Sequence, residues 1–471
     1  QQTLYATLAW SEELLQPEEQ RLFHRLAVFL GGFTLEAAEA VCTAPHGAAP
    51  LGVGMLQGLE ALVDQSLVQS WTVDGEGERE GAEDADSEAR FRLLYVIREY
   101  ALEHLDACGE ADAVRRTHAA YYLRLAEQAE PELRGPEGVA WLDRLEREHD
   151  NFRAALAWAQ AHPRSEAELG LRLAAALEPF WFQRGHVSEG RSWTEGLLDV
   201  VGQTQVGSAG AQGEVSAAVW ARALKAAGWL AHFGGGDYGQ TTAQLEAAAA
   251  AAQTAGDLHT AAAALSGLGA VAYFEGDLAR AAMRNEESVA LYRAVGSVGE
   301  VAYILSHLGE VALHRGDLAQ ATALSEEALM LARRAGELDA EVNTLCILGQ
   351  IARQRGDLRT AFALHRQGLS LARTLRDPFR IANTLEYLVN VVGAAGRGEQ
   401  AARLLGAAAE LRETIGAPRP SVEQALNEQE VAGARAVLGE QAWAAAYAAG
   451  RALSLEKAIA EALGEDEAAA D

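Results

Sequence analysis

A forty-residue repeat is the feature that most restricts how this chain can fold. The tripeptide Gly-Asp-Leu begins at Gly276, Gly316 and Gly356, and Gly396 follows at the same spacing. Leucines and alanines align at this period as well, at Leu268, Leu308, Leu348 and Leu388, and at Ala281, Ala321, Ala361 and Ala401. The units in register are 258–297, 298–337, 338–377 and 378–417. A period of about 20–50 residues is the signature of stacked repeat architectures.

Each unit predicts a pair of helices joined by a tight turn. In 298–337, Leu305, Leu308 and Ala312 share one helix face, and Leu318, Ala321, Leu324 and Ala328 share another. The glycine of the tripeptide ends the first helix with a left-handed residue, and the aspartate caps the second helix. Because one pair cannot bury its apolar face alone, neighbouring pairs must stack.

This pattern resembles the tetratricopeptide repeat at Leu308-Gly309, Ala312, Ala321 and Ala328. The resemblance implies a mainly α-helical superhelix with a concave groove. We predict a repeat array over 166–417, which includes a unit at 218–257 displaced by one residue and a divergent unit at 167–201. Capping helices and an acidic tail are expected over 418–471.

The first 105 residues follow a different pattern. "PEEQRLFHRLAVFLGGF" predicts a helix from Pro17 to the Gly31-Gly32 pair, "TLEAAEAVC" a helix capped by Thr34, and "VGMLQGLEALVDQ" a third helix. "SLVQSWTV" and "RFRLLYV" predict two strands. Three helices and a two-stranded ribbon make a winged helix at 1–105, followed by a predicted helical linker at 106–165.

The charge of this region argues against contact with DNA. The chain has a formal net charge of −28, and the third predicted helix carries Glu60 and Asp64 without Arg or Lys. The wing loop, 74–89, holds eight acidic residues against Arg79, a net charge of −7. We therefore expect no nucleic acid to bind this region. The alternative is a transcription factor whose winged helix contacts DNA directly.

Several N-terminal segments resemble bacterial STAND-type signal-transduction ATPases, including LuxR-type and antibiotic-regulatory-type transcriptional regulators. They are "LEALVDQSLVQ", "RFRLLYVIREYALEHL" and "LEREHDNFRAALAWA". In that family a P-loop ATPase precedes a regulatory winged helix and a helical repeat sensor. No G-x-x-x-x-G-K-[ST] motif occurs in this sequence. The resemblance therefore implies the C-terminal part of a longer protein, with ATP and Mg²⁺ bound by a missing N-terminal ATPase domain, which is itself an expected partner.

The motif search points to a protein that is not an enzyme. Neither H-E-x-x-H nor G-x-S-x-G occurs, and we interpret His307 and His314 as ordinary groove or surface histidines. Cys42, Cys108 and Cys346 are far apart, which favours a reducing cytoplasm without a disulfide framework or a zinc cluster. No apolar run of about eighteen residues predicts a membrane span. No cofactor is expected in this chain.

Groove residues follow from the helix faces. If Leu305, Leu308 and Ala312 are buried, then Tyr303, Glu310 and His314 point into the groove. The equivalent positions of the other units complete the predicted ligand-binding set with Arg222, Lys225, Trp229, Phe233, Tyr273, Asn343, Gln350, Arg353, Asn383 and Asn390. Asparagine can donate to and accept from a peptide backbone, and the basic pair can receive a carboxylate.

These observations predict the sensing region of a signalling ATPase or transcriptional regulator. Its partner in the groove would be a peptide, a protein or a small-molecule inducer. The same residues could instead be solvated, or could hold the winged helix in an inactive pose.

Overall fold

The computed structural model of the protein describes residues 2–45, 47–74, 77–79, 88–135, 137–205, 215–235, 237–416 and 431–464. Most of the predicted wing loop, the acidic tail from residue 465 and the segment 417–430 lie outside the described residues. Contacts divide the chain into two units. The N-terminal unit holds 1–130, 141–176 and 199–214, and the C-terminal unit holds 131–140, 177–198 and 215–471.

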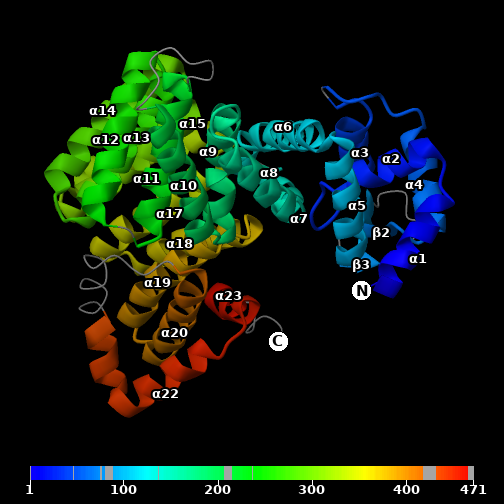
Figure 1. Ribbon diagram of the computed structural model, residues 1–471. Coiled ribbons are helices and arrows are strands. Elements are labelled where there is room, and N and C mark those ends of the chain that lie inside the picture. Colours follow the sequence, from blue (N-terminus) through cyan, green and yellow to red (C-terminus); the bar gives the residue numbers. More distant parts are fainter. Residues whose placement is uncertain are drawn as a thin grey trace. The chain divides into compact units, whose positions relative to one another are not determined.

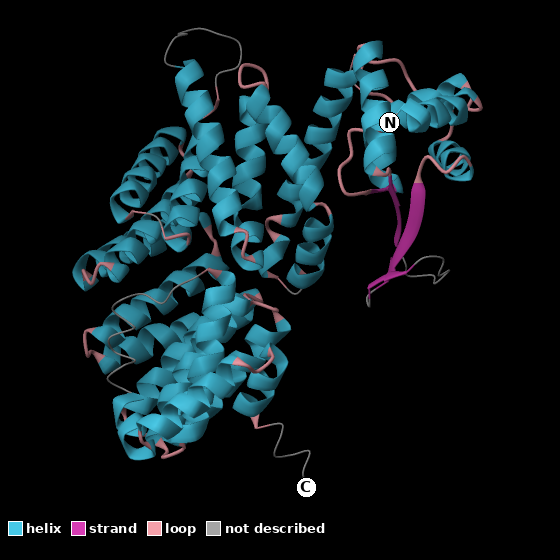
Figure 2. Ribbon diagram, turned by 60° about the horizontal axis from the view of Figure 1, so that its bottom comes forward, coloured by secondary structure: helices cyan, strands magenta, loops and turns pink. Residues whose placement is uncertain are grey.

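The N-terminal unit combines helices with a small antiparallel sheet (Figure 2). Its elements in chain order are α1 (Gln2–Glu13), α2 (Pro17–Leu26), β1 (Phe33–Thr34), α3 (Leu35–Cys42), α4 (Met55–Asp64), β2 (Gln69–Asp74), β3 (Gly77–Arg79), β4 (Glu88–Arg92), α5 (Tyr95–Cys108) and α6 (Ala111–Ala129). The strand order is β1-β4-β2-β3. Helix α2 begins at Pro17, and Thr34 caps α3 by accepting a hydrogen bond from the Ala37 N–H at 3.1 Å, both as predicted.

Helix α2 ends at Leu26, so the predicted extension to Gly31-Gly32 is wrong. Side chains from distant elements form hydrogen bonds with the backbone N–H and C=O groups of the residues that follow Leu26. Arg98 Nε donates to the Phe29 carbonyl at 2.9 Å, and the Leu30 N–H donates to Asn151 Oδ1 at 2.8 Å. The chain turns because these partners replace helical hydrogen bonds, and Phe29 then stacks on Phe33 with ring centroids 4.6 Å apart.

Much of the predicted linker, 106–165, packs into the N-terminal unit. Besides α6 it contains α7 (Gly138–Arg147) and α8 (His149–Ala161), and the contacts assign α6 and α8 to that unit. Buried Asn151 donates to the Gly32 carbonyl at 2.7 Å and to Glu148 at 2.8 Å. Glu148 also pairs with Arg90 of β4 at 2.6 Å, with both side chains less than 5% exposed. These buried polar bonds tie α8 to the sheet.

The C-terminal unit stacks helix pairs one after another (Figure 1). After η1 (Glu132–Arg134), parts of α9 (Ala167–Arg184) and α10 (Val187–Gln205) enter it. The pairs then run α11 (Ala217–Phe233), α12 (Tyr238–Ala255), α13 (Leu258–Phe274), α14 (Leu278–Val295), α15 (Val298–His314), α16 (Leu318–Ala335), α17 (Leu338–Gln354), α18 (Leu358–Thr374), α19 (Pro378–Ala394) and α20 (Gly398–Ile415). This is the predicted superhelical repeat.

Two further helices cover the last pair. Helices α22 (Glu440–Arg451) and α23 (Leu455–Leu463) bury Trp443 and Ile459 in a core that includes Leu404 of α20. The backbones of α20 and α22 approach closely at Gly406 and Gly450, where an added Cβ would collide with a backbone carbonyl of the opposite helix. The apolar face of α20 is therefore covered by α22 and α23.

The repeated tripeptide forms the predicted turns. Gly276, Gly316 and Gly356 have φ angles of 81°, 79° and 83°. The aspartate after each glycine accepts a hydrogen bond from the N–H three residues on; Asp317 does so from Gln320 at 2.9 Å. A left-handed residue followed by a helix cap thus connects the two helices of a pair.

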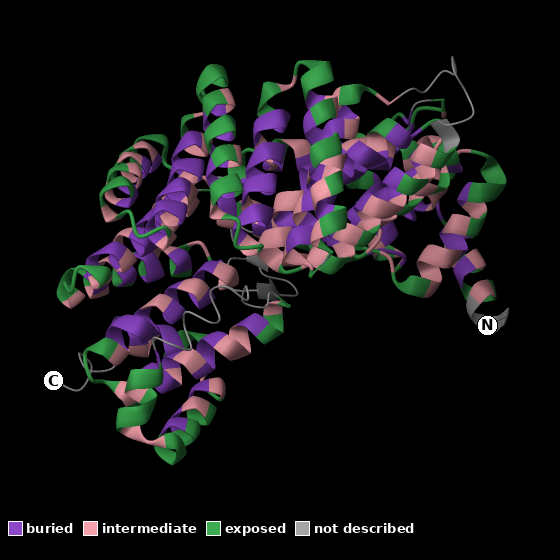
Figure 3. Ribbon diagram, turned by 90° about the vertical axis from the view of Figure 1, so that its left-hand side faces the viewer, coloured by how far each residue is buried: buried purple, intermediate pink, exposed green. Residues whose placement is uncertain are grey.

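Burial follows the predicted helix faces, and each helix turns a buried side towards its neighbours (Figure 3). Leu305, Leu308 and Ala312 of α15 are buried, as are Ala321 and Ala328 of α16. Within the described residues, no helix is both long and apolar enough to cross a membrane.

The turn glycine should be costly to replace. An added Cβ at Gly316 would meet no atom within 4 Å, so the cost of Gly316→Ala lies in the backbone alone. We expect it to lower the free energy of unfolding by about 1 kcal/mol, as measured by urea denaturation.

Gly202→Ala is the matched control, because Gly202 lies within α10 at negative φ with the same open space. There alanine should be neutral or stabilise by about 0.5–1 kcal/mol through helix propensity. Equal effects of the two substitutions would contradict the role given to the left-handed turn.

Candidate functional site

The first helices of successive pairs surround a partly enclosed cavity in the C-terminal unit, with a volume of about 90 Å³. Its wall comes from α11, α13, α15, α17 and α19, with Phe182 of α9 and Asn285 of α14. Of the thirteen residues predicted from the sequence, seven line it: Trp229, Phe233, Tyr273, Tyr303, Glu310, Asn343 and Asn383.

One side of the cavity is an aromatic cluster of Phe182, Phe233 and Phe379. The ring centroids lie 4.5 Å apart for Phe182 and Phe233, 5.9 Å for Phe233 and Phe379, and 5.7 Å for Phe182 and Phe379. Trp229 stacks on Phe233 at 5.6 Å. The cluster joins α9 and α11, at the start of the array, to α19 near its end. Such ring contacts add about 0.5–1.5 kcal/mol each beyond burial.

A second side of the cavity is a network around Glu310. The Tyr273 hydroxyl lies 2.9 Å from His314 Nε2 and 3.4 Å from Glu310, and His307 Nδ1 lies 3.6 Å from the same carboxylate. Burial alone raises the pKa of Glu310, but hydrogen bonds from His307 and Tyr273 and the positive potential of His307 and His314 outweigh it and hold this pKa below its usual value. Glu310 therefore presents a negative charge to the cavity at neutral pH.

The two asparagines predicted to hold a peptide backbone each use one polar atom inside the protein. Asn343 Nδ2 donates to Ser306 Oγ at 2.8 Å, and Ser306 donates in turn to the Tyr303 carbonyl at 2.7 Å. Asn383 Oδ1 accepts a hydrogen bond from Arg412. Their capacity to bind a ligand is therefore smaller than the sequence suggests.

Two arginines fix α19 between its neighbours. Arg380 donates to both oxygens of Asp339 on α17, at 2.6 and 2.8 Å, and its guanidinium lies 5.8 Å from the Tyr303 ring centroid. Arg412 of α20 donates to both oxygens of Glu386, each at 2.8 Å, and lies over the Phe379 ring. Bidentate pairs of this kind set orientation as well as distance. The position of Phe379 in the aromatic cluster therefore depends on them.

His232 is the least satisfied polar side chain in the cavity wall. It is 7% exposed, and neither ring nitrogen has a hydrogen-bond partner among the described residues. Phe274 and Phe233 pack edge-on against it at 4.5 and 4.9 Å. Burial lowers its pKa to about 4, so the imidazole is neutral at pH 7 and offers one donor and one acceptor. Buried polar atoms without partners are uncommon, and a bound water, ion or ligand is one explanation for them.

The other six predicted residues do not line the cavity: Arg222, Lys225, His314, Gln350, Arg353 and Asn390. The Lys225 ammonium lies 2.5 Å from Glu178 of α9, so its charge is balanced within the protein. Arg353 donates to Gln350 at 2.8 Å, and His314 lies behind Tyr273. Asn390 is buried in α19.

Sequence analysis missed Phe182, Phe379, Arg380 and Tyr387, all of which line the cavity. The repeat register predicted that Asn383 of α19 faces the groove. It did not indicate that residues in the first turn of α19, such as Phe379 and Arg380, also line the cavity. Phe182 belongs to the divergent unit, where the register is lost.

The comparisons with known proteins agree with this architecture. A family model described as tetratricopeptide repeat matches residues 300–374. A Mycobacterium tuberculosis protein, named as a candidate HTH-type transcriptional regulator, is 41% identical over 199 residues, which is 42% of this chain and 20% of that protein. An uncharacterised protein of the same species is 42% identical over 114 residues, 24% of this chain and 25% of that protein. The match with each relative thus spans a quarter or less of that relative's length.

Solved structures of low sequence identity were also found. A signal-transduction ATPase (STAND) protein with a tetratricopeptide repeat sensor, from Pyrococcus horikoshii, aligns with a TM-score of 0.46 and 13% identity over 96% of this chain and 66% of that chain. A Rap protein complexed with competence and sporulation factor aligns with a TM-score of 0.44 and 12% identity over 73% and 99%. The matched family model and the stacked helix pairs define a protein with a tetratricopeptide-like superhelix.

Asp377, the cap of α19, is buried at the edge of this site. Its carboxylate accepts a hydrogen bond from the Arg380 N–H at 3.0 Å, and the residue is 7% exposed. Burial raises the pKa of Asp377 to about 6, although the nearby Arg380 opposes the change. Because the folded pKa exceeds the unfolded one, ionised Asp377 destabilises the fold, and this cost grows as pH rises from about 4 to above 6.

We therefore expect Asp377→Asn to stabilise the protein at neutral pH, since asparagine also caps helices and carries no charge. The gain over wild type should grow by about 1–2 kcal/mol between pH 4.5 and pH 7.5, as measured by urea denaturation.

Asp357→Asn is the control, because Asp357 caps α18 with the same geometry in an exposed position. Hydrogen bonds from Thr360 hold the pKa of Asp357 below its usual value, so this variant should lose stability above the unfolded pKa. A gain at Asp377 that does not depend on pH would contradict the assignment.

Proposed function

We propose that this chain is the ligand-sensing region of a bacterial transcriptional regulator of the STAND class, and that the ligand binds in the aromatic cavity. The observation that carries the proposal is His232, whose two ring nitrogens have no partner among the described residues in the wall of a partly enclosed cavity. The similarity to a protein named as a candidate HTH-type transcriptional regulator supports the regulatory role.

The cavity wall defines the chemistry of the ligand. The aromatic cluster and Trp229 favour a ring, and neutral His232 favours a group that both donates and accepts hydrogen bonds, such as a hydroxyl. The ionised Glu310 disfavours an anion. An uncharged or cationic aromatic compound, or an aromatic side chain of a peptide, satisfies all three conditions.

The size of the cavity links binding to a change of conformation. Its volume of about 90 Å³ is smaller than the roughly 150 Å³ of a dry protein cavity that holds benzene. A ring can therefore be fully enclosed only if the aromatic cluster opens. Because this cluster joins Phe182 of α9 to Phe379 of α19, ligand entry would separate two ends of the array and shift the population towards an open form.

The N-terminal unit has a separate role in this proposal. Helices α2, α3 and α4, followed by the antiparallel strands β2 and β4, support a winged helix, and α1 precedes it. Helix α4 carries Glu60 and Asp64 and no basic residue, so we propose that the winged helix makes contacts within the intact regulator and does not bind DNA. The family resemblance assigns these contacts to an ATPase domain, whose nucleotide state the ligand would control.

Phenol and toluene test the assignment of His232, since they have rings of the same size and differ in the hydroxyl group. Wild type should bind phenol about tenfold more tightly than toluene, which corresponds to one net hydrogen bond of about 1.4 kcal/mol. His232→Phe should abolish this preference. Ligand-observed NMR titrations at millimolar concentration give both affinities.

His365→Phe is the matched control. His365 is fully buried and also has two ring nitrogens without partners among the described residues, but it does not line the cavity. This variant should keep the preference for phenol. Equal affinity of wild type for the two compounds, or an unchanged preference in His232→Phe, would contradict the proposed site.

A further inference from the structure

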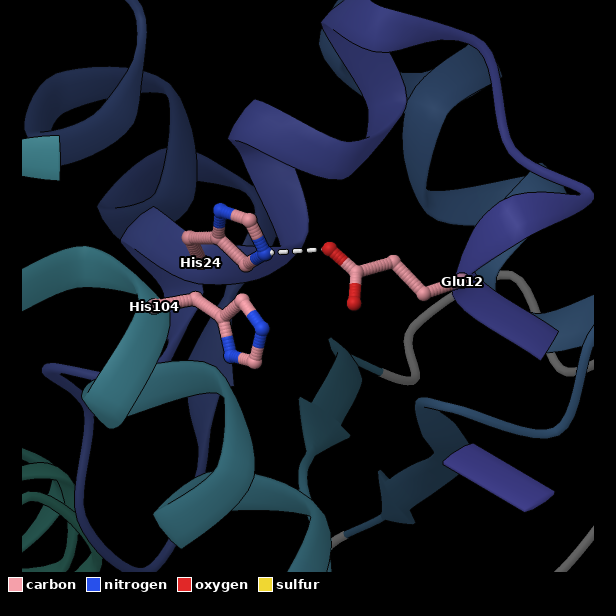
Figure 4. A group of neighbouring side chains, drawn as sticks. All are labelled: Glu12, His24 and His104. Carbon is pink, nitrogen blue, oxygen red and sulfur yellow. Dashed lines mark hydrogen bonds and ion pairs between the residues drawn. The ribbon is translucent and has the colours of Figure 1, made fainter. Parts of the chain in front are cut away.

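Three helices of the N-terminal unit bring together two imidazoles and one carboxylate, far from the aromatic cavity in sequence. Glu12 comes from α1, His24 from α2 and His104 from α5, and Figure 4 shows both rings beside the Glu12 carboxylate. One ligand atom from each residue lies within 4.8 Å of the other two. His24 Nε2 is 2.7 Å from Glu12 Oε1, and the two imidazole centroids are 5.2 Å apart.

Hydrogen bonds around the cluster orient its side chains as a metal site requires. His104 Nδ1 lies 2.8 Å from the Tyr100 carbonyl. A carbonyl only accepts, so Nδ1 carries the proton and Nε2 keeps its lone pair. The Tyr100 hydroxyl donates to Glu12 Oε2 at 2.5 Å, which leaves Oε1 on the side of His24. Ligating histidines and carboxylates in metalloproteins are typically fixed by such outer hydrogen bonds.

The surroundings of the cluster favour a cation. The Glu12 side chain is 12% exposed and that of His24 is 16% exposed, so the ligands are largely shielded from water. Glu103, which accepts a hydrogen bond from Tyr5 at 3.3 Å, adds negative charge on α5.

We propose that Glu12, His24 and His104 bind one divalent transition-metal ion of the zinc type. Ligand bonds of about 2.0–2.1 Å in a tetrahedral site give ligand-to-ligand separations of about 3.3 Å, which small rotations of these side chains reach. Two imidazoles select such an ion over Mg²⁺ or Ca²⁺, which prefer oxygen ligands. The bound ion would connect α1 to the α2–α5 pair and replace the His24–Glu12 hydrogen bond by two coordination bonds.

Zinc binding to the full chain tests this proposal. Isothermal titration with Zn²⁺ should show that wild type takes up one more equivalent than His104→Gln. His162→Gln is the matched control, because His162 makes the same bond from Nδ1 to a carbonyl four residues earlier, at 2.8 Å from the Trp158 oxygen, and belongs to no such cluster among the described residues. It should retain the wild-type stoichiometry. Co²⁺ should give a tetrahedral ligand-field absorption in wild type and in the control, but not in His104→Gln.

A second variant separates metal binding from folding. Tyr100→Phe keeps all three ligands and removes the bond that positions Glu12, so zinc affinity should fall by about 10–100-fold while the stoichiometry is unchanged. Circular dichroism of the metal-free variants shows whether each is folded. The proposal is overturned if folded His104→Gln binds as many equivalents as wild type, or if wild type shows no tetrahedral cobalt spectrum.

Discussion

The structure of the C-terminal unit depends on one constraint: a helix pair buries its apolar face only by packing on the next pair. The Gly-Asp turn fixes the geometry of each pair, since Gly316 adopts a left-handed conformation and Asp317 caps the helix that follows. Because this unit repeats every forty residues with the same geometry, the stacked pairs form a superhelix. Its concave side is then lined by the first helix of each pair, where Tyr273, Tyr303 and Asn343 meet around a cavity.

The sequence predicts the side-chain directions that recur in every repeat. It predicts less well the contacts between distant helix pairs, which depend on the curvature of the whole array. Counting along the helices predicted that Trp229, Glu310 and Asn383 face the groove, because each residue's direction follows from helical periodicity. The contact between Phe182 and Phe379 depends on the small rotation from each pair to the next, summed over the array, and local spacing does not encode that sum.

The same reasoning applies to the charged residues. Lys225 was predicted to receive an anionic ligand, but Glu178 of α9 neutralises it. Glu178 belongs to the divergent unit, whose register the repeat could not supply. In the N-terminal unit, the segment with Asn151 and Glu148 was predicted as a linker because its pattern shows only a helix. Its buried polar bonds depend on partners far earlier in the chain, Gly32 for Asn151 and Arg90 for Glu148, and no periodicity signals them.

Helix α19 is where the repeat departs from its own rules. In the other units, the residue that ends the second helix of a pair is a glycine with positive φ: Gly256, Gly296, Gly336 or Gly416. Before α19 the equivalent residue is Arg376, which has a φ of 50°. Its cap, Asp377, is buried and has a raised pKa. Local strain of this kind tends to occur at functional sites, and α19 contributes Phe379, Arg380 and Asn383 to the cavity. The bidentate pairs of Arg380 and Arg412 hold α19 in place beside the cavity.

A distance measurement tests most directly whether the aromatic cluster closes the cavity and opens for a ligand. Spin labels at Ser188 of α10 and Thr374 of α18, both exposed, report on the two sides of the cluster once exposed Cys108 is changed to serine. Double electron–electron resonance should show a longer and broader distance distribution when phenol saturates the protein. Phe379→Ala should show a similar distribution without phenol. An unchanged distribution in the presence of bound phenol would contradict the account.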